Sequence, residues 1–187
     1  MRPGFAFGGS CLPKDLRALL HAARRSDVHV PLLASIDPSN DHQIRRGIDA
    51  VLNARKKRIG VIGLAFKSGT DDLRESPMVK LVETLIGKGC AVRIFDPNVQ
   101  LASLVGANRA YIEHEIPHIS SLMSDNLDGL VEHAEVVVIG SGGKDAALAI
   151  SHCRPDQIVV DLTRAAIPQN KSVPHLAEVY AAGLNAQ

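Results

Sequence analysis

The sequence predicts an α/β protein in which a helical segment precedes a doubly wound parallel sheet domain. Two observations carry this prediction. Residues 13–54 show apolar positions at helical spacing and contain no strand pattern, whereas strand and helix patterns alternate from residue 58 onward. The basic run at residues 55–58, Arg-Lys-Lys-Arg, is typical of a solvated linker. We therefore expect two domains, residues 1–54 and residues 55–187.

The helical segment begins after a proline that suits a first helical turn. Pro13 lacks the N–H that this position leaves unused, and the apolar spacing after it predicts a helix over 13–25. A second helical region is expected over 31–52. Pro38 should kink or split that region, because proline removes a backbone hydrogen bond and clashes with the preceding turn.

The second domain is predicted as alternating strands and helices. A mostly apolar run at 59–66 is typical of a buried parallel strand. Ser76 and Pro77 mark the start of a helix that Gly87 or Gly89 can end. The further expected elements are a strand at 91–95, a short helix near 99–105, a helix near 126–133, a strand at 135–139, a glycine loop at 140–143 followed by a helix, and a strand at 158–162.

Composition argues against several functional classes. The net charge of +1 gives no reason to expect nucleic acid or an anionic membrane as partner. No apolar run approaches the ~20 residues of a membrane span, and residues 1–10 lack the apolar core of a secretory signal. Three cysteines and eight histidines without metal-ligand spacing predict thiols in a reducing compartment and no metal site. We expect a cytoplasmic protein.

The stretch GFAFGGSCLPKD, residues 4–15, is the first candidate for chemistry. Cys11 lies just before the predicted helix, whose N-terminus favours an anion by roughly 0.3–1 kcal/mol. A free thiol needs further activation near neutral pH, from Lys14, from backbone N–H groups or from another base. Asp15 is either an ordinary first-turn carboxylate or a group that orients water near the sulfur. A small buried cysteine in a turn is the alternative to a functional thiol.

The second candidate is LAFKSGTDDLRESP, residues 64–77, which leaves the carboxyl end of a predicted strand. Ligands bind at that edge of α/β sheets, and Lys67 and Arg74 could hold phosphate there. Asp72 and Glu75 also have capping-box spacing, so ordinary helix capping is an equal alternative. The dinucleotide fingerprint G-x-G-x-x-G is incomplete at residues 60–63 and again at 140–145.

These two motifs, in this order, closely resemble those of the nucleotide-sugar 6-dehydrogenases, the UDP-glucose and GDP-mannose dehydrogenase family. The opening RPGFAFGGSC and the run at 106–122, GANRAYIEHEIPHISSL, look like the GDP-mannose branch. The resemblance implies an NAD domain, a central helix that builds a homodimer, and a C-terminal Rossmann-like domain for the nucleotide. It covers only the back portion of the family's protein, so we expect a fragment or truncated reading frame.

The resemblance also implies a role for individual residues. A sugar C6 alcohol would become a carboxylate in two hydride transfers to NAD, with Cys11 forming a thiohemiacetal and then a thioester. Asp15, with a lysine outside these 187 residues, would position or activate water. Lys67 would contact the nucleotide-sugar, and Lys14 and Arg74 would contact the NAD diphosphate. Phe7 and Gly8 would line the sugar-nucleotide pocket, and Arg2 would reach the substrate of the dimer partner.

Two alternatives stay open beside GDP-mannose oxidation. One is a UDP-glucose 6-dehydrogenase. The other is a non-enzymatic module that binds a nucleotide-sugar or dimerises, which the incomplete NAD fingerprint favours for these 187 residues alone. We expect the isolated chain to be catalytically inactive.

Overall fold

The computed structural model of the 187-residue chain describes residues 5–65, 72–99 and 119–163. Four parallel strands form its sheet, in the order β2-β1-β3-β4. The strands are β1 (Arg58–Ile62), β2 (Ala91–Phe95), β3 (Val136–Ile139) and β4 (Ile158–Asp161). Because β1 lies between β2 and β3, the chain places β2 on one side of β1 and then returns to place β3 and β4 on the other side. The carboxyl ends of β1 and β3 therefore meet at a topological switch point.

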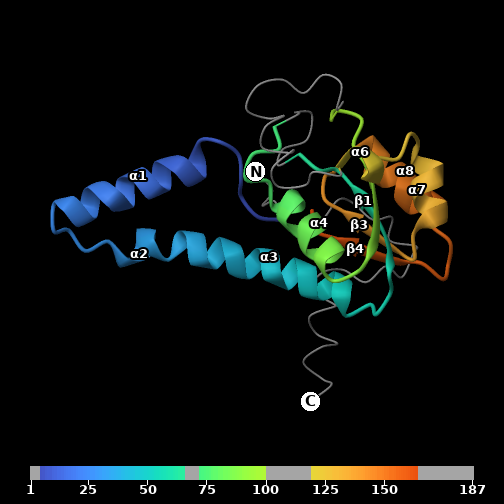
Figure 1. The fold of residues 1–187 in the computed structure, drawn as a ribbon, viewed down its shortest axis with the longest axis horizontal. Helices are drawn as coiled ribbons and strands as arrows, with labels where there is room; N and C mark the ends of the chain where they lie inside the picture. Colours follow the sequence, from blue (N-terminus) through green and yellow to red (C-terminus); the bar gives the residue numbers. More distant parts are fainter. Residues whose placement is uncertain (1–4, 66–71, 100–118, 164–187) are drawn as a thin grey trace, which may run out of the picture.

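Helices cover both faces of the sheet (Figure 1). On one face, α3 (Ile36–Leu52) and α4 (Pro77–Gly87) pack in a core with strand residues such as Ile59 and Val138. On the other face, α7 (Leu127–His133) and α8 (Lys144–His152) pack with Ile62, Val137 and Val159. Strands that are buried on both faces read as continuous apolar runs, as Val136–Ile139 does. The predicted doubly wound α/β architecture is confirmed.

A helical arm extends away from the sheet (Figure 1). We define it as residues 12–43: α1 (Leu12–Arg25), α2 (Pro31–Ala34) and the first half of α3. Helix α1 leads outward and α2 with α3 leads back, so only the second half of α3 reaches the core. Pro13 and Leu16 are the only buried residues of the arm. The predicted helix over 13–25 is confirmed, and most of its surface is open.

The second helical region is split, as expected from its proline, but the split falls at Ser35. Pro38 occupies the first turn of α3, where its missing N–H removes no bond that the helix needs. The ladder restarts with the bond from the Ser39 N–H to the Ser35 carbonyl, 3.0 Å long. A proline acts on the turn before it, and the break therefore precedes Pro38 by three residues.

Most element boundaries agree with the sequence. Helix α4 begins at Pro77 and has Ser76 as its cap, whose hydroxyl accepts from the Met78 N–H at 3.2 Å. The first strand is shorter than predicted and ends at Ile62, because Gly63 adopts a φ of 83° and turns the chain. A one-turn helix, α6 (Ile119–Leu122), lies in a stretch whose structure the sequence left undetermined. The helix expected near 99–105 falls almost wholly outside the described residues.

None of the helices in the described ranges has both the length and the apolar character that are needed to cross a membrane.

Candidate functional site

Cys11 is exposed and occupies the N-cap position of α1. Its backbone carbonyl accepts from the Asp15 N–H at 2.8 Å, while its side chain makes no capping bond. The Ser10 hydroxyl lies 3.8 Å from the sulfur. Lys14 and Asp15 stand in the first turn and pair with each other at 3.3 Å, both largely exposed. The sulfur is thus accessible at a helix N-terminus, with one cation and one carboxylate close in sequence.

Asn40 fixes the backbone that leads to Cys11. Its amide oxygen accepts from the Phe7 N–H at 2.9 Å, and its amide nitrogen donates to the Phe7 carbonyl at 2.9 Å. The two bonds imitate a strand pairing and hold the loop against α3. Sequence reasoning missed Asn40, because a residue 33 positions away leaves no local signal of this contact.

The glycine pair rests on the segment that precedes α4. The Gly9 N–H donates to the Arg74 carbonyl at 3.0 Å. A side chain on Gly8 would collide with the Glu75 carbonyl oxygen and would lie 2.8 Å from the Pro77 ring. Only glycine allows this close approach of two backbones. The two motifs singled out in the sequence, around Cys11 and over 64–77, are therefore in direct contact.

Within the second motif, charged side chains pair rather than cap. The Arg74 guanidinium binds the Asp72 carboxylate through Nε at 2.8 Å and Nη2 at 2.9 Å. These hydrogen bonds from Arg74 hold the pKa of Asp72 below its usual value, against a smaller opposing effect of burial. Glu75 pairs with Arg17 instead of capping α4. The capping-box interpretation of Asp72 and Glu75 is wrong, because Ser76 alone supplies the cap.

The carboxyl edge of β1 is held by a buried carboxylate at the end of β2. Asp96 accepts from the Leu64 N–H at 2.8 Å and the Ala65 N–H at 3.2 Å through one oxygen. Its other oxygen accepts from the Asn98 N–H at 3.0 Å. The Ser76 hydroxyl donates to the Leu64 carbonyl at 2.7 Å and closes the same turn from the other side. This network fixes the chain where it enters the second motif.

The described residues of this edge do not fit NAD. A dinucleotide fold uses a carboxylate at the end of its second strand for the ribose, but both oxygens of Asp96 serve backbone amides. Gly60 does not cradle a phosphate either, since its missing side chain makes room for Leu130 of α7, which a Cβ would approach to 2.6 Å. Within the described part of the chain, the sheet domain lacks a complete dinucleotide site.

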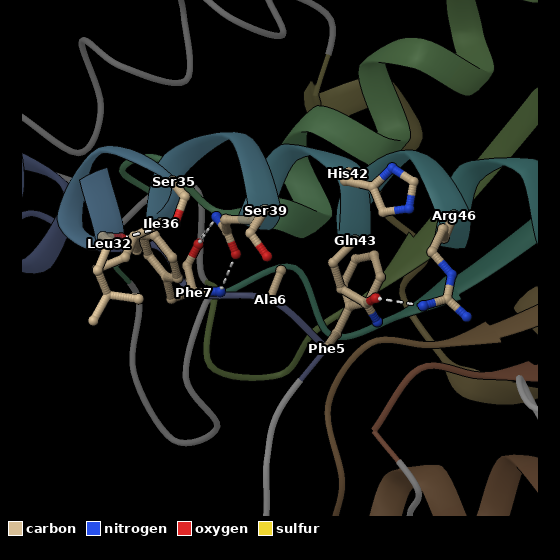
Figure 2. Close-up of a pocket in the computed structure, with 11 residues that line it drawn as sticks. Phe5, Ala6, Phe7, Leu32, Ser35, Ile36, Ser39, His42, Gln43 and Arg46 are labelled. Atoms are coloured by element: carbon tan, nitrogen blue, oxygen red, sulfur yellow. Dashed lines mark hydrogen bonds between the residues drawn. The ribbon is translucent and has the colours of Figure 1, made fainter.

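A groove of roughly 600 Å³ lies between Phe5–Phe7 and the helices α2 and α3. Figure 2 shows the two phenylalanines on one side, with Leu32, Ser39 and Gln43 among the helical residues that line it. Of the predicted site residues that the structure describes, only Phe7 lines this groove. Apolar walls with a few polar groups are typical of ligand pockets.

Two of the predicted site residues, Arg2 and Lys67, lie outside the described residues. The two cysteines other than Cys11 belong to the cores: Cys90 is buried in the core that contains α4, and Cys153 packs against the core that contains α8.

Comparison with known families identifies both parts of the chain. Residues 60–164 match the UDP binding domain of the UDP-glucose/GDP-mannose dehydrogenase family, and residues 1–42 match the central domain of that family. The chain belongs to the UDP-glucose/GDP-mannose dehydrogenase family. The two matched domains of this dehydrogenase family carry the two motifs that touch at Gly9 and Arg74.

Individual relatives within the family differ in similarity. The chain is 45% identical over 190 residues to the GDP-mannose 6-dehydrogenase of Pseudomonas aeruginosa, an alignment that covers 98% of this chain and 41% of the relative. The crystal structure of a ternary complex of GDP-mannose dehydrogenase from that organism superposes with a TM-score of 0.84 at 44% identity, covering 95% of this chain and 41% of that one.

A UDP-glucose dehydrogenase from Pyrobaculum islandicum superposes with a TM-score of 0.70 at 25% identity, over 92% of this chain and 38% of that one. The chain spans about two fifths of the length of the curated GDP-mannose 6-dehydrogenase to which it is 45% identical. The similarity is therefore greater on the GDP-mannose side of the family.

Proposed function

We propose that this chain supplies the nucleophile and the nucleotide-binding domain of a dehydrogenase that oxidises the C6 alcohol of GDP-mannose to a carboxylate. The observation that carries the proposal is the contact between the two motifs, with the Gly9 N–H bonded to the Arg74 carbonyl at 3.0 Å. It brings an exposed thiol to a segment of a nucleotide-sugar dehydrogenase domain. The identity to GDP-mannose enzymes, 44–45%, exceeds the 25–37% identity to UDP-glucose enzymes and supports GDP-mannose over UDP-glucose.

Cys11 is the proposed catalytic nucleophile. The thiolate sulfur attacks the C6 aldehyde, forms a C–S bond, and gives a thiohemiacetal. Loss of hydride from C6 turns this adduct into a thioester, which water hydrolyses to the carboxylate while the thiol is released. NAD, when bound, would accept one hydride in each of the two oxidations: from the C6 alcohol, which gives the aldehyde, and from the thiohemiacetal, which gives the thioester. Asp15, four residues from Cys11 and in the same helical turn, is the proposed group that positions the water.

The nucleotide-sugar is proposed to bind at the carboxyl edge of the sheet, over residues 63–77. Asp96 and Ser76 preorganise this edge by fixing Leu64 and Ala65. Lys67 is the proposed phosphate contact, and Phe7 and Gly8 the proposed wall of the sugar pocket. The division into a catalytic and dimerising part, 1–54, and a nucleotide-binding part, 55–187, belongs to the same proposal.

NAD requires more than these residues provide. Lys14 and Arg74 are proposed to face its diphosphate, yet Arg74 is engaged by Asp72, and Asp96 by backbone amides. We therefore expect these 187 residues alone to bind a nucleotide-sugar without forming NADH. The isolated chain would then act as a non-catalytic binding module, and the same fold would take part in catalysis when an NAD site is supplied to it.

The helical arm is proposed to form a homodimer. Leu19, Val28 and Leu32 are all more than half exposed, and Leu32 reaches 79%. The three lie on α1, α2 and the turn between them, so burying them requires a partner surface. Arg2 is the proposed contact to the substrate of the neighbouring subunit.

Titration calorimetry tests the binding proposal. The chain should release or absorb heat with GDP-mannose and bind it more tightly than UDP-glucose. Lys67→Ala should weaken GDP-mannose binding by roughly ten- to hundredfold, because a charged hydrogen bond to phosphate contributes about 1.5–3 kcal/mol. Lys56→Ala, which removes an exposed lysine paired with Glu135, is the matched control and should bind normally. If neither GDP-mannose nor UDP-glucose produces a heat signal, the binding proposal is contradicted.

A further inference from the structure

The contact between the two motifs has a side-chain component in addition to the glycine backbone. Arg17 of α1 donates to both carboxylate oxygens of Glu75, with Nη1 to Oε2 at 3.0 Å and Nη2 to Oε1 at 2.6 Å. Arg17 follows Cys11 by six residues on the same helix, and Glu75 directly follows Arg74, whose carbonyl holds Gly9. This bidentate ion pair between Arg17 and Glu75, the fork, therefore joins the helix that starts after Cys11 to the segment that precedes α4.

Glu75 adopts an unusual backbone conformation for this role. Its φ is 49°, in the left-handed region where a non-glycine residue is strained. This conformation directs the Glu75 carbonyl at Gly8 and leads straight into the Ser76 cap of α4. The residue is thus fixed on three sides: by Arg17 through its side chain, by Gly8 through its carbonyl, and by the helix cap through the chain.

Stability does not explain this arrangement. The Arg17 and Glu75 side chains are 53% and 33% exposed, and solvent screens an ion pair with that exposure so that it contributes little to stability. The pair therefore does little more than offset the strain of the Glu75 backbone. A bidentate fork does, however, fix the relative orientation of its two partners more tightly than a single contact.

We propose that Arg17 and Glu75 are positioning residues that hold Cys11 at the nucleotide-binding segment. The pair keeps α1 at the orientation in which the Gly9 N–H meets the Arg74 carbonyl, and so sets where the Cys11 sulfur stands relative to residues 72–77. The ligand named in the second test below rests on the proposed function, while the positioning itself does not.

Amide hydrogen exchange tests the positioning without any ligand. In Arg17→Glu and in Glu75→Arg, the Gly9 amide should exchange about threefold faster or more, because residues in direct contact are energetically coupled. The charge swap Arg17→Glu/Glu75→Arg should restore the slow exchange. The Gly63 amide, which donates to the Phe95 carbonyl at 2.9 Å inside the sheet domain, is the internal control and should not change.

Alkylation of Cys11 by iodoacetamide, followed by peptide mass spectrometry, supplies a readout that simple structural support would not move. Bound GDP-mannose should slow alkylation of Cys11 in the wild-type chain but not in Arg17→Glu, and the charge swap should regain the protection. The affinity of Arg17→Glu for GDP-mannose should stay within about threefold, because Arg17 joins the two motifs rather than contacting the ligand.

Unchanged Gly9 exchange in both single variants, or a charge swap that restores neither readout, would overturn the positioning role. If the wild-type chain binds no GDP-mannose, the proposed function fails, and the exchange of the Gly9 amide still decides the positioning role.

Discussion

The helical arm and the sheet domain are built from similar apolar residues but use them in opposite ways. In the sheet domain, the strands and the inner faces of α4, α7 and α8 are buried almost completely, with Leu85, Leu130 and Ile139 at zero exposure. In the arm, Leu12, Leu19 and Leu32 are each more than half exposed. Burial of a leucine side chain stabilises a fold by about 1.5–3 kcal/mol. The buried leucines of the sheet domain contribute this stabilisation, and the exposed leucines of the arm do not.

The difference separates what holds the fold from what serves the site. The sheet domain has a core on each face of its sheet, and Phe5 with the second half of α3 completes one of them. The arm begins directly after Cys11 and ends where Ile44 enters that core. Its contacts with the sheet domain include the ion pairs Arg17–Glu75 and Asp41–Lys80. The proposed homodimer would bury the apolar surface of the arm.

The largest effect we expect distinguishes the two regions by stability. Leu85→Ala should lower the free energy of unfolding by about 2–5 kcal/mol, because it leaves a cavity beneath α4. Leu19→Ala, the same change on the arm, should lower it by less than about 0.5 kcal/mol in dilute protein. Urea unfolding followed by circular dichroism measures both. Equal losses would show that the arm belongs to the same cooperative core.

The next effect concerns association through the arm. Leu32→Asp should weaken self-association at least about tenfold, because it places a carboxylate in the proposed interface. Leu148→Asp, at an exposed leucine of α8 outside the arm, should leave self-association unchanged. Sedimentation equilibrium over a range of concentrations provides the comparison. A wild-type chain that stays monomeric throughout would remove the dimer proposal.

The smallest effect concerns the Arg17–Glu75 pair, which is one of the ion pairs that join the arm to the sheet domain; Asp41 and Lys80 form another at 3.6 Å. The hydrogen bonds from Arg17 hold the pKa of Glu75 below its ordinary 4.5, more than burial raises it. A depressed pKa means that the pair stabilises the folded state above pH 4.5 and that this contribution disappears as the pH falls through the folded pKa. The effect should stay under about 1 kcal/mol because the pair is exposed.

A double-mutant cycle with Arg17→Ala and Glu75→Gln, followed by the free energy of unfolding, measures the coupling energy between the two side chains. The coupling energy should be measurable at pH 7 and should decrease as the pH falls below 4.5 through the lowered folded-state pKa of Glu75. A coupling energy that persists in acid would show that packing of the arginine stem, rather than charge, joins the arm to the sheet domain.

Elements with strong local signals were predictable from the sequence. Ser76 with Pro77 predicted the start of α4, and the alternation of strand and helix patterns predicted the doubly wound sheet. The break near Pro38 was expected, and its displacement to Ser35 follows from the reach of a proline ring into the preceding turn.

Contacts between distant residues were not predictable. Arg17 and Glu75 are 58 positions apart, and Asn40 lies 33 positions from Phe7. Neither pair leaves a periodicity, a spacing or a turn signature, because its geometry arises only once the arm has folded back toward the sheet. For the same reason, the spacing of Asp72 and Glu75 allows helix capping as an equal alternative, although their side chains bind arginines.

The buried carboxylate of Asp96 limits how this domain could be adapted. It stands at the strand end from which related sheets recognise a ribose hydroxyl, yet three backbone amides, those of Leu64, Ala65 and Asn98, already use both its oxygens. Converting the domain to a dinucleotide carrier would require a second support for Leu64 and Ala65 before Asp96 could turn outward. A protein engineer would therefore have to rebuild the neighbouring turn first and change ligand specificity second.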